Sequence, residues 1–415
     1  MKRFLSGWEA RPLSDFVERF DAGVSVNAED LPATNGDFGV LKLSCVSGGI
    51  FNPKENKRIL PAEVNKARVS PKKGRIIISR SNTTELVGAN AYVEEDYPTL
   101  FLPDTLWQSV YREDAVFSSR WLSYVLQSPA TRRLLGNLAS GTSGSMKKLN
   151  RTSVLNIEII TPTHEEQLAI ADILVCWDRK IETLEQLFLT KTCLKRGLMQ
   201  QLLTGRKRFR GFDWLEWKRV KISDFTKLTL RPTPKPDKPF KSLGIRSHGK
   251  GTFLKENFEP QKIGLTELYE VKENDLIVNI TFAWEGAIAV ARPVDSGALV
   301  SHRFPTYVFD TERAISEYFR HIIVQKWFVE KLELISPGGA GRNRVLSKKD
   351  FAKIEILMPS VDEQKRIAAV LNTCDREIDL LRRQIAALKK QKHGLMQKLL
   401  TGQIRVKMEN EEAQR

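Results

Sequence analysis

The sequence has few cysteines, few histidines and no long apolar run, and each shortage excludes a class of protein. Its four cysteines in 415 residues form no CxxC pair, so neither a zinc ribbon nor a disulfide scaffold is indicated. We expect free, buried thiols in a protein of the reducing cytoplasm. The five histidines stand singly, and we expect no metal site. No run of 18 apolar residues occurs, so no membrane-spanning helix is predicted.

Nucleotide-binding and catalytic signatures are also missing. The chain has no GxxxxGK[ST] phosphate loop and no GxGxxG after a predicted strand. It lacks the Ser/His/Asp, Cys/His and HExxH arrangements of hydrolases. The asparagine–proline–proline–aromatic tetrad of amino-methylating DNA enzymes is missing as well. These absences predict a binding protein that has no catalytic residues and leaves the chemistry to other proteins.

Positive charge is what the sequence has in excess. The formal net charge is +16, from 66 lysines and arginines against 50 aspartates and glutamates. An excess of this size favours a polyanionic partner, which is either nucleic acid or an anionic membrane surface. Charge alone also leaves open a basic soluble protein that has no such partner.

The strongest pattern in the sequence is an internal repeat. The peptide GLMQQLLTG at 197–205 recurs as GLMQKLLTG at 394–402, with eight of nine positions identical. At this offset of 197 residues the match runs back without a gap to Pro162 and Pro359. A period this long is too long for a solenoid and indicates two copies of one domain plan.

A second match lies at the front of each half, where WEARPLSDF from Trp8 resembles WKRVKISDF from Trp217. Between these fronts and the shared ends, the two halves look unrelated. The order is therefore variable, constant, variable, constant, which indicates that the copies share one task and differ in another. The predicted boundaries are 1–148 and 211–345 for the variable domains, 149–210 for the first conserved helical region with a helix at about 164–203, and 346–415 for the second with a helix at about 361–400.

The constant segments have the start and stop signals of long helices. Each begins with a predicted capping box, Thr163-x-x-Glu166 or Ser360-x-x-Glu363, that follows a proline. Each ends at a Thr-Gly step that suits a left-handed C-cap. In the second copy, apolar residues recur at alternating steps of four and three, as in a coiled coil. Because each helix has one apolar stripe and the chain has two copies, we expect the helices to pair antiparallel.

Two pairs of repeat equivalents interrupt the predicted helices. Lys195 and Lys392 fall on the apolar stripe, where the charge must reach water or a carboxylate. They either fix the register of the pair or lie at splayed ends. Gly197 and Gly394 each cost about 1 kcal/mol against alanine inside a helix, and close approach of another backbone would explain them. The expected partner-docking residues are Gly197, Met199, Leu203, Gly394, Met396 and Leu400.

The variable segments predict two compact α+β domains. Short β-rich runs alternate with glycine and proline turns, and an amphipathic helix comes late in each segment, at 120–126 and 315–332. The predicted strands include residues 40–43, 75–79, 276–280, 287–291 and 306–309.

Polar loops of these domains contain the candidate DNA-binding residues. SRSNTTE (79–85) has arginine and asparagine, which make bidentate contacts with guanine and adenine. SGTSGSMKK (140–148) and SPGGAGRNR (336–344) are glycine-rich and basic, which suits approach to phosphate, and IRSHGKG (245–251) is similar. For any single loop, a solvated turn is the alternative. The expected DNA-binding residues are Arg80, Ser81, Asn82, Thr83, Lys147, Lys148, Arg246, His248, Lys250, Arg342, Asn343 and Arg344.

The motif order resembles the specificity (S) subunit of Type I restriction–modification systems over essentially the whole chain. The resemblance rests on the SDF front motif, on P-[ST]-x-x-EQ-x2-IA at the helix starts and on G-L-M-Q-x-L-L-T-G at the helix ends. It implies two target-recognition domains joined by two long antiparallel coiled-coil helices. Each domain would read one half of a bipartite, asymmetric site in double-stranded DNA. The helices would set the spacer and dock two modification (methyltransferase) subunits.

The resemblance also implies where cofactors act. S-adenosylmethionine, ATP and Mg would be used by the partner modification and restriction (translocase/nuclease) subunits, and this chain would bind none of them. Three alternatives stay open. The chain could be a coiled-coil protein-interaction scaffold, the specificity subunit of a modification-only system, or an enzyme with duplicated recognition domains and a degenerate active site.

Overall fold

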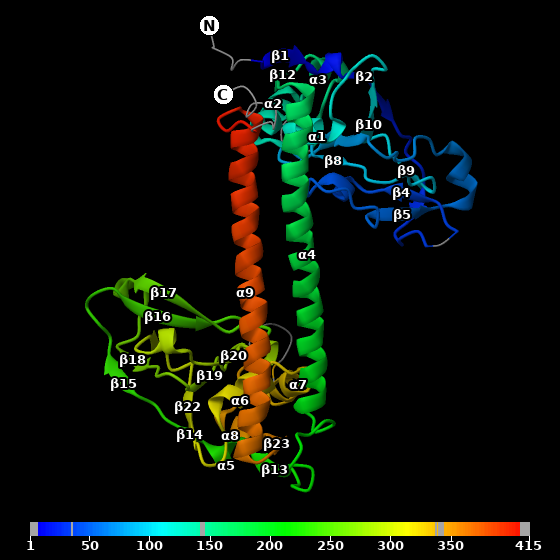
Figure 1. Cartoon of the computed structure of the whole chain (residues 1–415). Helices are drawn as coiled ribbons and strands as arrows, with labels where there is room; N and C mark the ends of the chain where they lie inside the picture. The colour runs from blue at the N-terminus through cyan, green and yellow to red at the C-terminus, as the bar shows by residue number, and fades with distance from the viewer. Residues whose placement is uncertain (1–6, 35, 142–145, 337, 339–343, 407–415) are drawn as a thin grey trace, which may run out of the picture. The chain divides into compact units, whose positions relative to one another are not determined.

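The computed structural model describes residues 7–34, 36–141, 146–336, 338 and 344–406 (Figure 1). Contacts divide the chain into unit 1, Met1–Leu184 with Gln384–Arg415, and unit 2, Glu185–Arg383. Each unit therefore contains one variable domain and a part of both long helices. These units cut across the boundaries expected from the sequence, because each long helix contributes its two ends to different cores.

Unit 1 has a sheet in the order β2-β10-β6-β8 and a second sheet in the order β3-β5-β4-β9. Strand β6, in the interior of the first sheet, is buried along its whole length. The strands are β1 (Glu9–Pro12), β2 (Val17–Ala22), β3 (Ala28–Glu29), β4 (Gly39–Leu41), β5 (Asn56–Ile59), β6 (Ile76–Ser79), β7 (Ser81–Asn82), β8 (Asn90–Tyr92), β9 (Leu100–Phe101), β10 (Leu106–Tyr111), β11 (Lys147–Lys148) and β12 (Glu158–Thr161). The helices are α1 (Ser119–Gln127), α2 (Pro129–Leu138), α3 (Arg151–Leu155) and the first part of α4 (His164–Leu202).

Unit 2 has a sheet in the order β14-β22-β19-β20 and a second sheet in the order β15-β18-β21-β16-β17. Its strands are β13 (Lys218–Lys221), β14 (Thr226–Leu228), β15 (Pro232–Pro234), β16 (Phe240–Ile245), β17 (Thr252–Phe258), β18 (Glu267–Glu270), β19 (Leu276–Val278), β20 (Ile288–Val290), β21 (Leu299–Val300), β22 (Thr306–Phe309) and β23 (Glu355–Met358). Its helices are α5 (Ile222–Phe225), α6 (Ser316–Ile322), α7 (Lys326–Leu334), α8 (Lys348–Ala352) and most of α9 (Val361–Leu400).

The first sheets of the two units have the same strand order, although their sequences look unrelated. Strands β2, β10, β6 and β8 of unit 1 correspond in order to β14, β22, β19 and β20 of unit 2, and all the pairings are antiparallel. The second sheets differ in strand order between the units. The divergence seen in the sequence therefore lies on a shared sheet framework.

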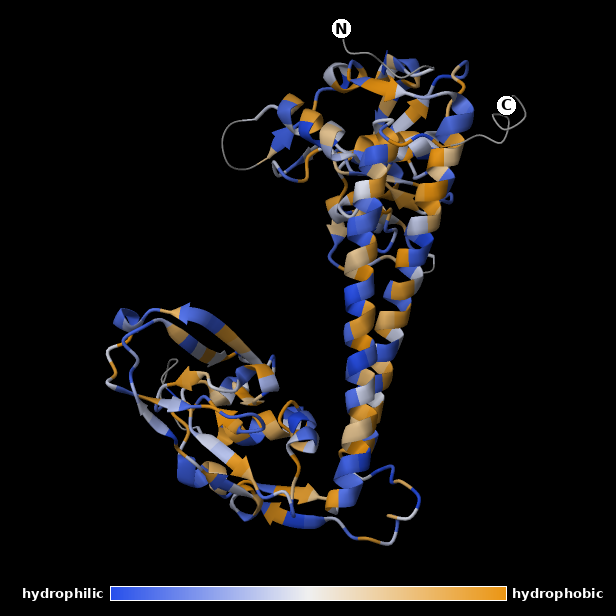
Figure 2. Cartoon of the chain, turned by 60° about the vertical axis from the view of Figure 1, so that its left-hand side comes forward, coloured by the Kyte–Doolittle hydropathy of each residue, from blue (hydrophilic) through white to orange (hydrophobic). Residues whose placement is uncertain are grey.

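The long helices extend nearly as expected, over 39 residues in α4 and 40 in α9. In unit 2 the Lys191 ammonium lies 2.8 Å from Glu377, and Lys195 bonds Asp375. A later residue of α4 thus meets an earlier residue of α9, so the helices run antiparallel there. Hydrophilic and hydrophobic residues alternate along both long helices (Figure 2). The α+β fold with paired antiparallel helices is confirmed, and no helix of the described residues is both long and apolar enough to cross a membrane.

The predicted strands are present, but one predicted helix is wrong. Residues 315–332 form two helices, α6 and α7, because Gln325 adopts an extended backbone between them and its side chain donates to the carbonyl of His321. Gln325 is the repeat equivalent of Ser128, which separates α1 from α2 before Pro129. Only the first copy has a proline, Pro129, from which the break between the two helices could be predicted.

The cysteines are free, as expected, but not all are buried. Cys45 lies in the core of unit 1, where burial raises its pKa to about 12. Cys176 and Cys193 are exposed on α4 and Cys374 is half-buried on α9. The expectation of burial was wrong for the two exposed residues, because the apolar stripe of a paired helix is narrow and they fall outside it.

No neighbouring backbone of the described chain lies close to the two helical glycines. A Cβ built at Gly197 or Gly394 would meet no atom of the described residues within 4 Å. The explanation expected for them, close approach of another segment, is therefore wrong within this chain.

Replacing Gly197 or Gly394 by alanine is expected to raise the free energy of unfolding by up to about 1 kcal/mol each, because alanine has the higher helix propensity. Urea denaturation of the full chain measures this change. Gly88→Ala is the matched control, because Gly88 has a φ of +75° and a Cβ there would lie 3.0 Å from that of Leu135. The control substitution should lower the stability of the chain. A loss of stability in G197A would contradict the open space that the structure shows around Gly197.

Candidate nucleic-acid interface and the contacts that support it

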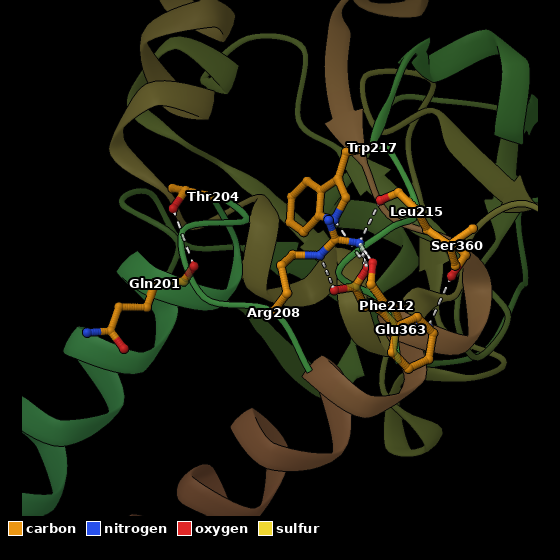
Figure 3. A network of polar contacts seen from close by, with 8 residues as sticks. All are labelled: Gln201, Thr204, Arg208, Phe212, Leu215, Trp217, Ser360 and Glu363. Carbon is orange, nitrogen blue, oxygen red and sulfur yellow. Dashed lines mark hydrogen bonds and ion pairs between the residues drawn. The ribbon is translucent and has the colours of Figure 1, made fainter. Parts of the chain in front are cut away.

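A buried polar cluster fastens the start of α9 in unit 2 (Figure 3). Arg208 donates to both carboxylate oxygens of Glu363, from Nε at 2.6 Å and from Nη2 at 2.7 Å. The indole Nε1 of Trp217 donates to the same carboxylate at 3.2 Å. Arg208 also donates to the carbonyls of Phe212 and Leu215 at 2.7 and 2.9 Å. The hydrogen bonds to Glu363 are the largest cause of a raised Arg208 pKa. We call Trp217, Glu363 and Arg208 the unit 2 closing cluster.

Unit 1 has an equivalent cluster at the start of α4. Glu166 accepts a hydrogen bond from Trp8 Nε1 at 2.9 Å and two from Arg405, each at 2.9 Å. Arg405 lies 197 residues after Arg208, so it is the repeat equivalent. Trp8, Glu166 and Arg405 form the unit 1 closing cluster. In both units, the glutamate of one repeat is bound by the arginine that follows the long helix of the other repeat.

These contacts correct the predicted capping boxes. The hydroxyls of Thr163 and Ser360 accept from the backbone N–H of Glu166 at 3.4 Å and of Glu363 at 3.5 Å, as expected. The glutamate side chains, however, accept from tryptophan and arginine rather than turning back to the cap. The reason is burial, since a buried carboxylate needs a cation with several hydrogen bonds. The sequence signal for these clusters was the recurrence of the arginine at the repeat offset, and it was missed.

The glutamine next to each glutamate links the long helix to the variable domain. Gln167 Oε1 accepts from the backbone N–H of Ser118, the N-cap of α1, at 2.9 Å, and its Nε2 donates to the carbonyl of Pro162 at 3.0 Å. Gln364 makes the equivalent bonds before α6 and α9. Both glutamines are buried. The recurring Glu-Gln pair therefore fixes two elements of each unit against one another.

The lysines on the helical stripe reach carboxylates, which was one of the two expected outcomes. In unit 1, Lys392 of α9 bonds Asp178 of α4, and the hydroxyl of Tyr124 donates to the same aspartate at 2.7 Å. The Lys392 ammonium also lies 5.1 Å from the centre of the Tyr124 ring. Burial and the nearby Asp178 raise the pKa of Tyr124. A residue of α1 thus joins the contact between the helices.

In unit 2, a histidine takes the place of the tyrosine. Lys195 bonds Asp375, the equivalent of Asp178, and His321 stands 197 residues after Tyr124. The His321 Nε2 lies 2.9 Å from Asn372 Oδ1, and its Nδ1 lies 3.9 Å from Asp375. Burial is the largest cause of a lowered His321 pKa; Lys195 and Arg320 lower it further, against the opposing effects of Asn372 and Asp375.

Three of the six expected partner-docking residues lie inside the chain's own cores, and a fourth, Met199, packs against one of them while staying partly exposed. Leu203 is in the core of unit 2, with Met199 packed against it, and Met396 and Leu400 are in the core of unit 1. They were wrongly taken as a surface for another subunit. The end of each helix instead packs on the unit that contains the start of the other helix. Of the remaining two, Gly197 is exposed and Gly394 is half-buried. The peptide recurs because two equivalent docking sites exist within one chain.

In unit 1, the structure brings two of the predicted DNA-binding stretches together. Strand β7 pairs with β11, so that Asn82 lies opposite Lys147 and Ser81 opposite Lys148. Ser81 and Asn82 are buried, and Asn82 donates to Ser79 Oγ at 3.2 Å. Their expected role as exposed base contacts was therefore wrong, because they hold the ribbon together. Thr83 and Lys148 are exposed and Lys147 is half-exposed.

An aromatic side chain organises the cations beside this ribbon. The guanidinium groups of Arg80 and Arg151 lie 5.8 and 5.5 Å from the centre of the Trp107 ring. The carbonyl of Arg80 accepts from the backbone N–H of Leu149 at 2.9 Å, which ties the two stretches together. Arg151 is exposed and was missed in the sequence, although it directly follows the glycine-rich basic loop. Arg132 supports the neighbouring loop by donating to the carbonyls of residues 85 and 87.

In unit 2, the predicted residues gather around the turn between β16 and β17. Arg246, His248 and Lys250 are exposed there. The backbone N–H of His248, a residue with a φ of +61°, donates to the carbonyl of Glu285 at 2.7 Å. The guanidinium of Arg344 lies 5.0 Å from the ring centre of Trp284, the residue before Glu285 in sequence. Arg342 and Asn343 lie outside the described residues.

The two cationic clusters can neutralise phosphate and offer hydrogen-bond donors to base edges. Unit 1 contributes Arg80, Thr83, Lys147, Lys148 and Arg151, and unit 2 contributes Arg246, His248, Lys250 and Arg344. Within the described chain, no group of three or more His, Cys, Asp or Glu side chains is placed to hold a metal ion.

Comparisons with known proteins agree in the family they indicate. A family model described as Type I restriction modification DNA specificity domain matches residues 5–188 and 215–390. The Type I restriction enzyme MjaVIII specificity subunit of Methanocaldococcus jannaschii is 25% identical over 296 residues, which are 65% of this chain and 68% of that protein. The crystal structure of a Type-I restriction-modification system S subunit from M. genitalium has a similar fold, with a TM-score of 0.62 over 98% of both chains at 14% identity.

Replacing Arg208 by alanine is expected to lower the free energy of unfolding by about 3 kcal/mol, because Glu363 is 0% exposed and would stay buried without its cation. Arg405→Ala should cost less, because the Arg405 side chain is 42% exposed against 17% for Arg208, so water can replace part of its contact. Thermal denaturation of the full chain compares them. Arg208→Lys keeps the positive charge but loses the paired hydrogen bonds, so its free energy of unfolding should lie between those of the wild type and Arg208→Ala. Equal losses for R208A and R405A would contradict the dependence on burial.

The buried His321 predicts a loss of stability at mildly acidic pH. Its pKa is lowered in the folded chain, so the unfolded chain binds the proton more tightly. The contribution is present above about pH 6.5, the ordinary pKa of histidine, and is lost as pH falls below it. Unfolding midpoints measured from pH 7.5 to 5 should fall more in the wild type than in His321→Gln. His248→Gln, at an exposed site, is the control and should follow the wild type. If the unfolding midpoint of H321Q falls with pH as much as that of the wild type, the loss of stability comes from other groups.

Proposed function

Since the chain belongs to the Type I restriction–modification DNA specificity family, we propose that each of its two variable domains reads one half of a bipartite, asymmetric site in double-stranded DNA. The observation that supports this most directly is the pairing of one shared sheet framework with two different sets of fully or partly exposed cationic residues. The duplicated framework would carry one set in each unit, and the different positions and chemistry of the two sets would let them read different bases.

In this proposal, the cations of each cluster divide into two roles. Lys147, Lys148 and Arg151 of unit 1 would neutralise phosphates, which gives affinity without sequence preference. Arg80 and Thr83 would face base edges. In unit 2, Arg344 would serve phosphate, whereas the exposed turn from Arg246 to Lys250 would enter a groove and discriminate bases. Ser81 and Asn82 would support the unit 1 ribbon without touching DNA.

The chain would have no catalytic role of its own. Modification subunits would transfer the methyl group from S-adenosylmethionine, and restriction subunits would use ATP and Mg for translocation and cleavage. The missing nucleotide-binding and methyltransferase motifs support this division. The cytoplasm, where host DNA and these cofactors are found, would be its compartment.

The paired helices would have a structural role in recognition. Because an α-helix rises about 1.5 Å per residue, the length of α4 and α9 would set the spacer between the half-sites. The closing clusters and the Asp–Lys pairs, which recur in both units, support a scaffold that is kept while the recognition surfaces change.

The test is a methyl-adenine map of host DNA after co-expression of the chain with its candidate modification subunit. The wild type should give one split motif. Arg80→Ala should relax one half and Arg246→Ala the other, each with a loss of about tenfold or more for the correct base, because a bidentate contact contributes about 1–3 kcal/mol of discrimination.

Lys326→Ala, at an exposed lysine on α7 outside both clusters, is the control and should leave the motif unchanged. Methylation by the chain alone would refute the non-catalytic role. A stable complex that methylates no DNA would favour the protein-interaction scaffold. Relaxation of the same half by both variants would refute the assignment of one half-site to each unit.

A further inference from the structure

The second sheet of unit 2 ends in a two-stranded antiparallel ribbon, formed by β16 and β17 (Figure 1). Gly244 of β16 lies opposite Phe253 of β17, and Ser242 lies opposite Lys255. The next strand of the sheet, β21, pairs with β16 at Ser242 alone. Between Ser242 and the turn, the two strands of the ribbon therefore pair only with each other within the described chain.

The ribbon has one face on an apolar core and one face turned outward. Leu243 and Ile245 are buried in the core that the second sheet covers, and Leu254 packs against that core. Gly244 and Phe253 point to the other side, because side chains alternate along a strand. Phe253 is half-buried and belongs to none of the apolar cores of the described residues.

The outward face of the ribbon carries a stack of three residues. The Phe253 ring lies so close over Gly244 that a Cβ at the glycine would come within 2.3 Å of the ring atom Cζ. The guanidinium carbon of Arg246 lies 5.0 Å from the centre of the same ring. Arg246 Nη1 also donates to the carbonyl of Thr252 at 3.1 Å. Arg246 is exposed, yet its guanidinium is held by two contacts with the opposite strand.

Most of the hydrogen-bonding capacity of Arg246 is left for a ligand. A guanidinium has five N–H donors, and among the described residues only Nη1 of Arg246 has a hydrogen-bond partner. No carboxylate of the described chain forms an ion pair with it. An arginine that is held in place while most of its donors stay free suits a ligand with two acceptors side by side, such as the O6 and N7 edge of guanine.

The turn that joins the two strands is fixed as well. The backbone N–H of Arg246 donates to the carbonyl of Gly251 at 2.9 Å, which closes the turn. The N–H of Gly249 donates to the carbonyl of Gly286 at 3.1 Å, beside the bond that His248 makes to the same segment. Base reading requires side chains that a rigid element holds in place. The backbone of Arg246 meets this requirement.

The charge and the shape of the ribbon both suit DNA. Residues 240–258 contain four lysines and arginines against one carboxylate, Glu256, which lies near the end of β17 away from the turn. A second carboxylate, Glu285, accepts from the hydroxyl of Ser247 at 2.7 Å. The cations outnumber these carboxylates, which favours a phosphate-lined groove. A two-stranded ribbon is one of the elements that the major groove of B-DNA admits.

We propose that the outward face of the β16–β17 ribbon enters the major groove, where Arg246 reads a guanine and Phe253 positions Arg246. The inference rests on the proposed function for DNA as the ligand, and on the ribbon for the reading element, the base and the positioning residue. The stack favours base reading over phosphate binding. A phosphate contact tolerates a mobile cation, whereas a bidentate contact with one base needs a guanidinium whose plane is fixed.

The experiment measures initial methylation rates of the purified complex of the full chain with its candidate modification subunit. Two DNA duplexes are compared. One carries the site from the methyl-adenine map, and the other has A·T in place of the G·C pair at which Arg246→Ala relaxes that site. Arg246→Ala should lower the preference for G·C about tenfold or more, because a bidentate contact is lost. Phe253→Ala should lower it about two- to fivefold, because the cation–π contact is lost.

Three further variants separate positioning from a structural role. Arg246→Ala combined with Phe253→Ala should be no more relaxed than Arg246→Ala alone, because the ring acts only through the arginine. Phe253→Tyr keeps a ring over Gly244 and should keep the wild-type preference. Gly244→Ala keeps both side chains but displaces the ring, so it should relax the same base pair. If Phe253→Ala does not fold, Phe253→Leu removes the ring with less loss of packing and carries the same expectation.

Lys255→Ala is the matched control on the same face of the ribbon. Lys255 is exposed, lies two residues from Phe253 along β17 and would contact phosphate. Its loss should slow methylation of both duplexes equally and leave the preference for G·C unchanged. The preference at the unit 1 half-site should be unchanged in every variant.

The outcomes that contradict the inference differ from those that contradict the proposed function. A wild-type preference in Phe253→Ala, beside a relaxed Arg246→Ala, would overturn the positioning role alone. Arg246→Ala that slows both duplexes equally, or relaxes an A·T pair and no G·C pair, would overturn the guanine contact. Relaxation of both half-sites by Phe253→Ala or Phe253→Leu would show that the ring only supports the fold. A wild-type complex that methylates no DNA would overturn the proposed function and this inference together.

Discussion

The structure of each unit depends on a carboxylate that is buried at the start of a long helix. Glu166 and Glu363 are almost completely withdrawn from water, and an unpaired charge there would cost several kcal/mol. The cation that pairs with each comes from the segment after the other repeat's helix. Neither repeat can therefore satisfy its own glutamate. The pairing of the two helices, the position of the helix ends and the duplication of the chain are therefore all needed to neutralise the two glutamates.

Because the constant contacts are complete in themselves, the rest of each unit is free to change. The closing clusters, the Glu-Gln bonds and the Asp–Lys pairs involve both long helices, the arginines that follow them, the tryptophans just before β1 and β13, and the start of the first helix of each variable domain. The second sheets and the exposed polar loops take no part in them. Two domains can therefore keep one sheet order while the polar loops that carry the cations differ between the units.

The sequence predicted the parts that depend on local signals and on the repeat. Capping residues and periodicity placed both long helices to within about two residues, and β-rich runs located the strands. What it could not predict was which polar and apolar side chains are buried, because burial is decided by distant segments. Ser81 and Asn82 looked like base-reading residues in an exposed loop, but pairing with β11 buries them. Leu203 and Met396 were predicted to bind another subunit, but they pack in the cores of this chain.

The contact between Tyr124 and Asp178 shows how a constant scaffold accepts variable domains. In the other unit, the equivalent aspartate faces His321, a residue of different size and with different hydrogen-bonding groups. In both units the aspartate keeps its bond to the lysine of the apolar stripe. The lysine pairs with the carboxylate in both units, so the domain needs to offer only one compatible polar group. A recognition domain can then diverge up to the helix surface without disturbing the helix pair. The group that meets the aspartate is therefore a tyrosine in unit 1 and a histidine in unit 2, while the bond between the helices is the same.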